Sequence, residues 1–491
     1  MTKGPGMVFW ARAVVAAVGI SSLAACAVGP DYQRPEAAEP AHYKERAADT
    51  GIWSPGRPAD GIDRGAWWGV FGDPVLDGLM EQVTVSNQNI KAAEAAYRQA
   101  MAAADAAFAG LFPTLSGGAS GQRSQSLATS RPGGATTSVV GSSFSASLSA
   151  SWAPDIWGKV RRAVEQGDAA AEASAADLAN ARLSAQGALA ADYFALRYQD
   201  ALKHLLEATA TAYRRSLDIT RNQYAAGTAA RSDVAQAETQ LASTEAQLVA
   251  TGVQRATLEH AIAVLTGKAP ADFSLPDTGV LAAVPDVPAG VPSDLLQRRP
   301  DIAAAERRVA AANAAIGIAI SAYFPSLTLT GSDGFSSSSL GSLIQTSNNV
   351  WSFGPQLAVT LFDAGARSAQ VEEARAAYDQ SVATYRQTVL AALQAVEDQM
   401  AALKTLSAQA DVQGRAVASA KEAERLITNQ YLAGTVAYTS VVTAQTASLT
   451  NQQTALSIAQ SRLAATVSLI QALGGGWQVP EASASVAPPQ G

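Results

Sequence analysis

Cysteine, histidine and charged residues are all scarce in this sequence of 491 residues. The single cysteine, Cys26, cannot form a disulfide within one chain. The three histidines, His42, His204 and His260, are far apart and have no His-x-x-His or Glu-x-x-His spacing, so the sequence predicts no metal site. Charged residues make up 16% of the chain, below the usual level of about 25%, and Ala, Ser, Gln and Thr take their place.

Long apolar runs and basic patches are also missing. After the N-terminus no stretch approaches 18 continuous apolar residues, so we predict no transmembrane helix and expect any membrane crossing to use strands. A net charge of −7 without a basic stripe argues against nucleic acid as a partner. Glycine-rich stretches such as 474–476 lack the Lys-Ser/Thr of a phosphate-binding loop. We therefore expect a protein that is not an enzyme, with no catalytic residues, no metal and no cofactor.

The first 25 residues have the pattern of a bacterial export signal. Lys3 and Arg12 form a basic start, and 13–23 is an apolar run too short to span a bilayer. The small residues before Cys26 resemble a lipobox, which predicts cleavage before Cys26 and lipid on its sulfur, a stable anchor when more than one acyl chain is attached. Ala27, where an aspartate would favour the inner membrane, indicates the outer membrane. The alternative is a cysteine that is removed with the leader.

The rest of the chain contains two similar units. FPTLSGGASG at 112–121 recurs as FPSLTLTGSDG at 324–334, and TRNQYAAGTAARSDVAQAE at 220–238 recurs as ITNQYLAGTVAYTSVVTAQ at 427–445. Two markers that recur at nearly the same offset indicate an internal duplication. The predicted organisation is a signal peptide at 1–25, an irregular N-terminal segment at 26–80, repeat 1 at 81–270, a linker at 271–301, repeat 2 at 302–474 and a tail at 475–491.

Each repeat contains segments of alternating polar and apolar residues. In FSASLSASW at 144–152 every second residue is serine, which is typical of a tilted membrane-spanning strand of about 9–11 residues. We predict strands at about 114–121, 142–152, 325–334 and 351–361, with surface loops at 122–141 and 335–350. The residues predicted to face a watery lumen are Ser145, Ser147, Ser149, Thr328 and Thr330. The alternative is a half-buried sheet of a soluble protein.

Long helices follow the predicted strands in each repeat. Residues 160–223 and 366–430 are nearly free of Gly and Pro, and a straight helix of this length extends roughly 95 Å. In the return helices that follow, apolar residues recur every seven positions, which predicts coiled-coil packing. These residues are Val234, Leu241 and Leu248 in the first unit and Val442, Leu449, Leu456, Leu463 and Ile470 in the second.

The two helical hairpins are predicted to turn at the duplicated element, near 224–232 and 431–439. Gly227 and Gly434 follow a long helix directly, the usual position of a left-handed cap. Thr228 or Ser232 is the expected N-cap of the first return helix.

Four strands per chain are too few for a membrane barrel, which needs about eight or more, and an open sheet edge is not tolerated in lipid. The chain must therefore oligomerise if the strands enter a membrane. Three copies supply twelve strands and leave room for a conduit, whereas two copies supply eight and a lumen filled by side chains. We expect a closed, symmetric homotrimer.

Three segments resemble one known family. They are CAVGPDYQRP at 26–35, WWGVFGDPVLDGL at 67–79 and RRPDIAAAERRVAAANAAIGIAISAYFPSLTLTGSDG at 298–334. The chain resembles the TolC-like outer-membrane efflux channels, in their NodT-type lipoprotein branch, over nearly all of its mature length. The resemblance implies a mixed α/β-barrel membrane protein: a trimer with a twelve-stranded barrel in the outer membrane, four strands per chain, continuous with a long α-helical coiled-coil tunnel in the periplasm.

The resemblance also implies how the shorter helices lie and which partners the chain has. A helix at 81–111 is expected to stack end to end with the 228–267 helix, and one at 302–323 with the 437–473 helix. Family members serve as exit ducts of tripartite pumps, in which a periplasmic adaptor connects them to an inner-membrane transporter, most often of the resistance-nodulation-division class. Adaptor hairpins dock at the tips, a role that carries over to Ala226, Gly227, Thr228, Gly434 and Thr435.

Family members often narrow the pore with a carboxylate ring on the second return helix. The corresponding residue here is Thr443, with Thr439 at the constriction one turn earlier, and neither matches the family pattern. Asp233, at the position equivalent to Ser440, is the nearest substitute; its alternative role is a first-turn carboxylate that favours the helix dipole.

The sequence therefore predicts a passive outer-membrane exit channel for small toxic molecules or drugs. The alternatives are a non-conducting periplasmic coiled-coil lipoprotein and an exit duct for metal ions or for type I protein export. Neither the adaptor, the transporter nor the cargo is named by the sequence.

Overall fold

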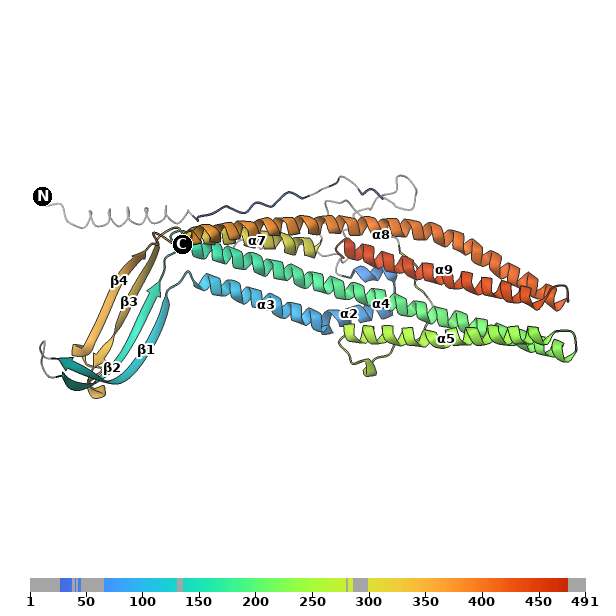
Figure 1. The fold of residues 1–491 in the computed structure, drawn as a ribbon, viewed down its shortest axis with the longest axis horizontal. Helices are drawn as coiled ribbons and strands as arrows, with labels where there is room; N and C mark the ends of the chain where they lie inside the picture. The colour runs from blue at the N-terminus through green and yellow to red at the C-terminus, as the bar shows by residue number, and fades with distance from the viewer. Residues whose placement is uncertain are drawn as a thin grey trace, which may run out of the picture. The chain divides into compact units, whose positions relative to one another are not determined.

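The computed structural model describes residues 27–37, 40, 43–45, 66–129, 136–279, 281–285 and 299–475. In chain order the elements are η1 (Trp67–Phe71), α2 (Pro74–Ser86), α3 (Gln88–Ala109), β1 (Thr114–Thr129), β2 (Thr136–Trp152), α4 (Lys159–Ala225), α5 (Arg231–Leu265), η2 (Pro270–Asp272), α7 (Pro300–Ser321), β3 (Ser326–Ser337), η4 (Leu340–Ser342), η5 (Thr346–Asn348), β4 (Asn349–Ala358), α8 (Ala366–Leu432) and α9 (Tyr438–Ala472) (Figure 1). Cys26, the predicted signal peptide and most of the predicted C-terminal tail lie outside the described residues.

The chain divides into two compact units. The sheet unit contains the described residues of Met1–Pro35, Arg98–Ala173 and Glu306–Thr384; the helical unit contains those of Glu36–Tyr97, Ser174–Ala305 and Tyr385–Gly491. Both long helices, α4 and α8, contribute residues to each unit. Within the described residues no helix is long and apolar enough to cross a membrane.

The four strands form one antiparallel sheet in the order β1-β2-β3-β4. The register is continuous along each pair, with Thr114 opposite Ser151, Phe144 opposite Ser337 and Ser326 opposite Ala358 at the pair ends. Because directly opposite residues share a face, this register places every side chain of the sheet on one of two faces.

The strands of the first hairpin are longer than the sequence predicts. Residues 122–129 and 136–141, expected to be loop, continue β1 and β2 as a two-stranded ribbon beyond the pairing with β3, which begins at Phe144. A composition rich in glycine, serine and asparagine suggested loops between the strands, but backbone pairing depends on the partner strand more than on composition. In the second hairpin, the predicted loop at 335–350 contains the end of β3, η4, η5 and the start of β4, and β4 ends at Ala358.

An N-terminal strap, residues 27–35, packs against helices of the sheet unit. Gly29 has φ +102°, and a Cβ there would lie 2.5 Å from the Gly317 Cα of α7, so only glycine fits. Arg162 of α4, which is 5% exposed, donates to the Gly29 carbonyl at 3.3 Å and to the Asp31 carboxylate at 2.8 Å. The strap therefore begins, one residue after Cys26, in a fixed position near the start of α4.

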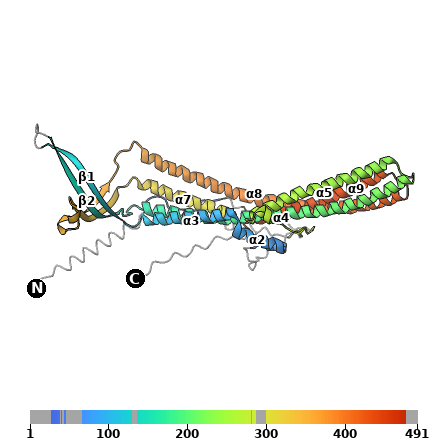
Figure 2. The same ribbon diagram turned by 90° about the horizontal axis from the view of Figure 1, so that it is seen from below.

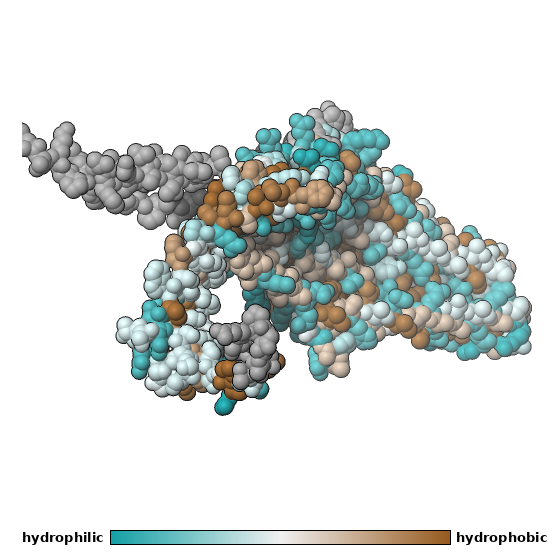
Figure 3. All heavy atoms as spheres, turned by 60° about the vertical axis from the view of Figure 1, so that its left-hand side comes forward, coloured by the Kyte–Doolittle hydropathy of each residue, from teal (hydrophilic) through white to brown (hydrophobic). Residues whose placement is uncertain are grey.

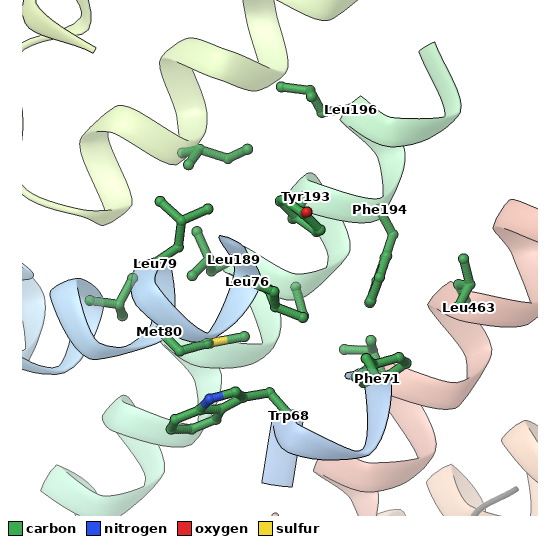
Figure 4. Close-up of a cluster of buried hydrophobic side chains, with 14 of the residues drawn as sticks. Trp68, Phe71, Leu76, Leu79, Met80, Leu189, Tyr193, Phe194, Leu196 and Leu463 are labelled. Carbon is green, nitrogen blue, oxygen red and sulfur yellow. The ribbon is translucent and has the colours of Figure 1, made fainter. Parts of the chain in front are cut away.

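The core of the helical unit lies where α2, α4 and α9 meet (Figure 4). Apolar side chains from the three helices and from η1 form one cluster, which includes Trp68, Phe71, Leu76, Leu79, Met80, Leu189, Tyr193, Phe194, Leu196 and Leu463. The Phe71 and Phe194 rings pack 4.7 Å apart. The heptad residues Leu463 and Ile470 belong to this cluster, so the seven-residue repeat of α9 has its packing partner here.

Helix ends meet through side-chain hydrogen bonds. The predicted helix at 81–111 is in fact two helices, α2 and α3, that break at Asn87. The Asn87 amide donates to the Leu265 carbonyl at the end of α5 at 2.8 Å, and its oxygen accepts from the Asn89 backbone N–H at 2.9 Å. One polar side chain thus caps α3 and binds the end of α5, a contact between distant segments that helical periodicity does not reveal.

A different side chain makes the corresponding junction in the second repeat. Arg299, just before α7, donates to the Ala472 carbonyl of α9 at 2.8 Å and forms an ion pair with Asp301 at 2.6 Å. A cation at a helix C-terminus interacts favourably with its free carbonyls.

A buried carboxylate holds the chain segment that follows α5. Asp200 of α4, fully buried, pairs with Arg197 at 3.0 Å and with Arg255 of α5 at 2.8 Å. The two guanidinium groups also donate to the carbonyls of Pro276 and Leu275, at 2.7 and 2.6 Å. The charges are paired and hydrogen-bonded, as buried charges must be.

Candidate channel-lining face and hairpin tips

The five residues predicted to face a lumen lie on one face of the sheet. In the register Ser149 is opposite Ser332, Ser151 is opposite Thr330, and alternation places Ser145, Ser147 and Thr328 on the same side. Hydroxyl groups pair across the strands of this polar face: the Ser120 and Ser145 oxygens are 2.8 Å apart and those of Ser332 and Ser352 are 2.9 Å apart.

The opposite face of the sheet is mainly apolar. It carries Phe144, Leu148, Trp152, Phe335, Trp351, Phe353 and Leu357. Leu148 is 57% exposed and Trp351 75% exposed in the single chain. The sheet therefore has two unlike faces, and β1 and β4 are its two free edges.

The side of the strands that Figure 3 shows is mostly pale, with few strongly apolar side chains. Serine, threonine and glycine, which predominate in these strands, have intermediate hydropathy and account for this colour.

The two hairpin tips have the same geometry. Gly227 has φ +74° and Gly434 has φ +72°, and nothing lies within 4 Å of a Cβ placed on either. Glycine is therefore required at the tips by the backbone angle and not by lack of space.

A threonine closes each turn. Thr228 donates from its backbone N–H at 2.9 Å and from its hydroxyl at 3.0 Å to the Gln223 carbonyl. Thr435 makes the same two bonds to the Gln430 carbonyl, at 3.0 and 2.9 Å. Each Gly-Thr pair thus satisfies free carbonyls at the end of a 67-residue helix. Ala226 lies in the first turn, where its N–H donates to the Asn222 carbonyl at 3.0 Å.

The N-cap of α5 differs from the prediction. It is Ala230, not Thr228 or Ser232, and its backbone N–H donates to the Asp233 carboxylate at 3.3 Å. Helix α5 begins at Arg231, so Thr228 lies two residues before the N-cap, and its hydroxyl donates to the end of α4 instead. Asp233 therefore completes half of a capping box, the bond from the third helical residue back to the N-cap.

The gate candidates on α9 are exposed threonines. Thr439 and Thr443 lie one turn apart near the N-terminus of α9, and the Thr443 hydroxyl donates to the Thr439 carbonyl at 2.9 Å. Asp233 lies in the first turn of α5, on the other hairpin of the same unit.

A compact core lies behind the tips, where α4, α5, α8 and α9 come together (Figure 2). Tyr438, 1% exposed, has its ring 5.2 Å from that of Tyr431, and its hydroxyl lies 3.3 Å from the Ser216 hydroxyl of α4. The heptad residues Val234 and Leu241 pack in this cluster, which joins both hairpins.

Sequence reasoning missed a polar ladder between α5 and α9. Gln240 donates to the Thr446 hydroxyl at 3.1 Å, and Gln453 donates to the Gln247 side-chain oxygen at 3.2 Å. Gln240 and Gln247 are seven residues apart on α5, and Thr446 and Gln453 are seven residues apart on α9. The polar contacts therefore recur with the same seven-residue period as the apolar residues. The signal was present as glutamines at a seven-residue spacing, but their partners lie on the other repeat.

Among the described residues no group of three or more His, Cys, Asp or Glu side chains is placed to hold a metal ion.

A family model described as outer membrane efflux protein matches residues 79–268 and 291–475, close to the two repeats of the sequence. The chain belongs to the outer membrane efflux protein family. Its fold is TolC-like, with two repeats that supply four strands and long helices per chain.

Relatives and solved structures cover almost the whole chain. The solvent efflux pump outer membrane protein SrpC of Pseudomonas putida is 33% identical over 462 residues, 93% of this chain and 97% of that protein. The cation efflux system protein CusC of Escherichia coli is 30% identical over 460 residues, again 93% and 97%. The open-state structure of the Neisseria gonorrhoeae MtrE outer membrane channel superposes with a TM-score of 0.80 at 28% identity, covering 92% of this chain and 99% of that one.

This membership gives the chain its general role. It is the outer-membrane channel component of an efflux pump, with a helical extension in the periplasm, and it is not an enzyme.

Proposed function

We propose that three copies of this chain form the exit channel of a tripartite pump that releases small toxic organic molecules. The observation that carries the proposal is a four-stranded sheet with one apolar face, one hydroxyl-bearing face and two free edges. An exposed edge in lipid leaves backbone groups without partners, so β1 of one copy pairs with β4 of the next until the sheet closes. Three copies supply twelve strands, with the apolar face toward lipid and the polar face toward the lumen.

Lipid on Cys26 anchors the chain in the outer membrane, as in the NodT-type branch. The support is the lipobox-like sequence and the fixed start of the N-terminal strap, where Arg162 holds Gly29 and Asp31. A strap held by main-chain contacts places the attached lipid at a defined point of the sheet unit.

The hairpin tips receive a periplasmic adaptor, which connects the channel to an inner-membrane transporter of the resistance-nodulation-division class. The docking residues are Ala226, Gly227, Thr228, Gly434 and Thr435. Two features support this role: both turns have the same backbone geometry, and both are exposed in the single chain.

The channel is closed near Thr439, Thr443 and Asp233 until the adaptor binds. Opening separates the hairpins that meet at the Tyr438 cluster, and the adaptor must bind the open arrangement more tightly than the closed one. Asp233 accepts a hydrogen bond from the Ala230 N–H, so it supports the start of α5 and keeps a carboxylate beside the gate.

Planar-bilayer recording tests the channel and its tip. We would compare wild type, Gly434→Pro and the control Gly414→Ala, an exposed glycine inside α8 with open space around a Cβ. Wild type and the control should open rarely or with small conductance, and Gly434→Pro should open more, because proline cannot adopt φ +72°. An oligomer that never inserts contradicts the strand assignment, and equal conductance in all three contradicts gating at the tip.

Cargo is tested by deleting the gene and measuring tolerance. Loss of tolerance to organic solvents and antibiotics supports the proposal. Loss confined to toxic metal cations, or a loss of protein secretion alone, favours the two alternative export roles.

A further inference from the structure

The polar face of the sheet consists mostly of hydroxyl, amide and glycine positions, with Val139 and Val350 as uncharged exceptions near the strand ends. On β1 and β2 the register pairs Ser116 with Ser149, Ser120 with Ser145 and Gln122 with Ser143. On β3 and β4 it pairs Ser332 with Ser352 and Thr328 with Gln356. The two repeats contribute the same chemistry to this face.

The described strands contain two formally charged side chains, and the register places both on the other face. Arg123 is opposite Ser142, which shares the apolar face with Phe144. Asp333 lies between Leu148 and Trp351, and its carboxylate accepts a hydrogen bond from the Asn349 amide at 2.9 Å. Composition alone does not reveal this segregation, because a shift of one residue in register would exchange the faces.

Helix α9 repeats the pattern beside the proposed gate. Its 35 residues contain one formally charged side chain, Arg462, in the C-terminal third of the helix. Thr439, Thr443, Thr446 and Thr450 form an exposed stripe at helical spacing. The Thr443 hydroxyl donates to a carbonyl of its own helix, and this position carries no charge.

We propose that the strand part of the channel lining does not discriminate by charge, so that it passes uncharged and amphiphilic organic molecules as readily as ions and does not attract metal cations. This inference rests on the proposed function, because it requires the polar face to line the lumen. Fixed charges facing the lumen would bias ion entry at moderate salt, whereas the register turns the Arg123 and Asp333 side chains to the opposite face.

Thiol labelling of reconstituted trimers tests the lining without requiring an open tip. Ser147→Cys is compared with Ala146→Cys on the opposite face, and the chain without an added cysteine is the blank. Each variant is treated with a cationic and an anionic methanethiosulfonate. The rate with the cationic reagent is divided by the rate with the anionic reagent, and this ratio is normalised to the same ratio for a free thiol in solution. Ser145→Cys replaces Ser147→Cys if the latter gives no heat-resistant trimer.

We expect Ser147→Cys to react with both reagents, with a normalised ratio within about threefold of one. Adding Ser149→Asp, two residues from Ser147 and on the same face, should raise the ratio about tenfold, since a ring of charges at this short range attracts the cationic reagent. Asp333→Asn should leave the ratio unchanged, because that carboxylate lies on the other face.

Two results separate the possible failures. In the first, the normalised ratio of Ser147→Cys differs from one by about tenfold or more, and Asp333→Asn or Arg123→Gln restores it. The lining then discriminates by charge, and the inference is wrong although the proposed channel function stands. If Ala146→Cys reacts and both serine variants do not, the wrong face lines the lumen and the proposed arrangement of the strands fails.

Discussion

At the residue scale, a few side chains fix the turns and the strap. Gly227 and Gly434 adopt left-handed angles that an alanine would strain, and the threonine after each glycine closes the turn with two hydrogen bonds. The N-terminal strap depends in the same way on Gly29 and on the Tyr32 hydroxyl, which donates to the Glu306 carboxylate.

Gly434→Ala should loosen the tip. An alanine at φ +72° costs about 1–2 kcal/mol, whereas Gly414→Ala within helix α8 should gain up to about 1 kcal/mol. Hydrogen exchange of peptides around the turn should therefore accelerate roughly 5- to 30-fold in the first variant and not in the second. Unchanged exchange in Gly434→Ala would show that the turn tolerates a side chain.

The strap should release as the pH falls. Burial would raise the pKa of the Glu306 carboxyl, but hydrogen bonds from Arg307 and Tyr32 outweigh it and hold this pKa below its usual value. A lowered pKa in the folded state contributes stability above the unfolded value, about 4.3, and this stability is lost as the pH falls through the folded pKa.

Hydrogen exchange of residues 27–35, corrected for its intrinsic rate, checks this between about pH 6 and pH 3. Wild type should lose protection below about pH 4.3, and Glu306→Gln, which removes this titrating group, should lose clearly less. The same pH dependence in both proteins would assign the effect to another group.

At the element scale, helices α4 and α5 of the first repeat are joined by ion pairs that contribute differently to stability. Asp200 is fully buried between Arg197 and Arg255, while the Arg214–Glu245 pair between α4 and α5 is about half exposed on both sides. A buried carboxylate that is removed leaves its cations uncompensated, whereas an exposed pair is screened by water and salt.

Asp200→Asn should therefore destabilise the helical unit by about 3–5 kcal/mol, and Glu245→Gln by about 0–1 kcal/mol. Thermal loss of the detergent-resistant oligomer, followed by gel electrophoresis, measures both under the same conditions. Equal shifts in the two variants would mean that the segment after α5 is not held by the Asp200 cluster.

At the scale of the whole molecule, the sheet is the feature that requires partner copies. A single chain has free edges at β1 and β4 and an apolar face with Trp351 and Leu148 exposed. When β1 of one copy pairs with β4 of the next, the edge backbone groups gain hydrogen-bond partners. The closed sheet then has no open edge exposed to lipid.

Native mass spectrometry of the detergent-solubilised protein should give three copies, each without residues 1–25 and with the added mass of lipid. Cys26→Ala should abolish the lipid mass and the cleavage before residue 26, because both need the cysteine. Two copies would contradict the trimer, and an unmodified wild-type chain would contradict the lipid anchor.

The sequence by itself determined the duplication, the alternating strands, the long helices and the tip glycines. These features are local: period-two and seven-residue patterns and a glycine after a helix each report on the backbone within one segment. Family membership followed from the same segments, and both repeats that they suggested are matched.

Only the tertiary structure decided the features that depend on a distant partner. Residues 122–129 are strand because 136–143 pair with them, and helix 81–111 breaks because Asn87 binds the end of α5. The face of Arg123 and the α5–α9 amide ladder were likewise fixed by register between separate segments. The physical reason is that a residue's sequence neighbours set its local conformation, whereas its face and its hydrogen-bond partner are set by whichever chain segment packs against it.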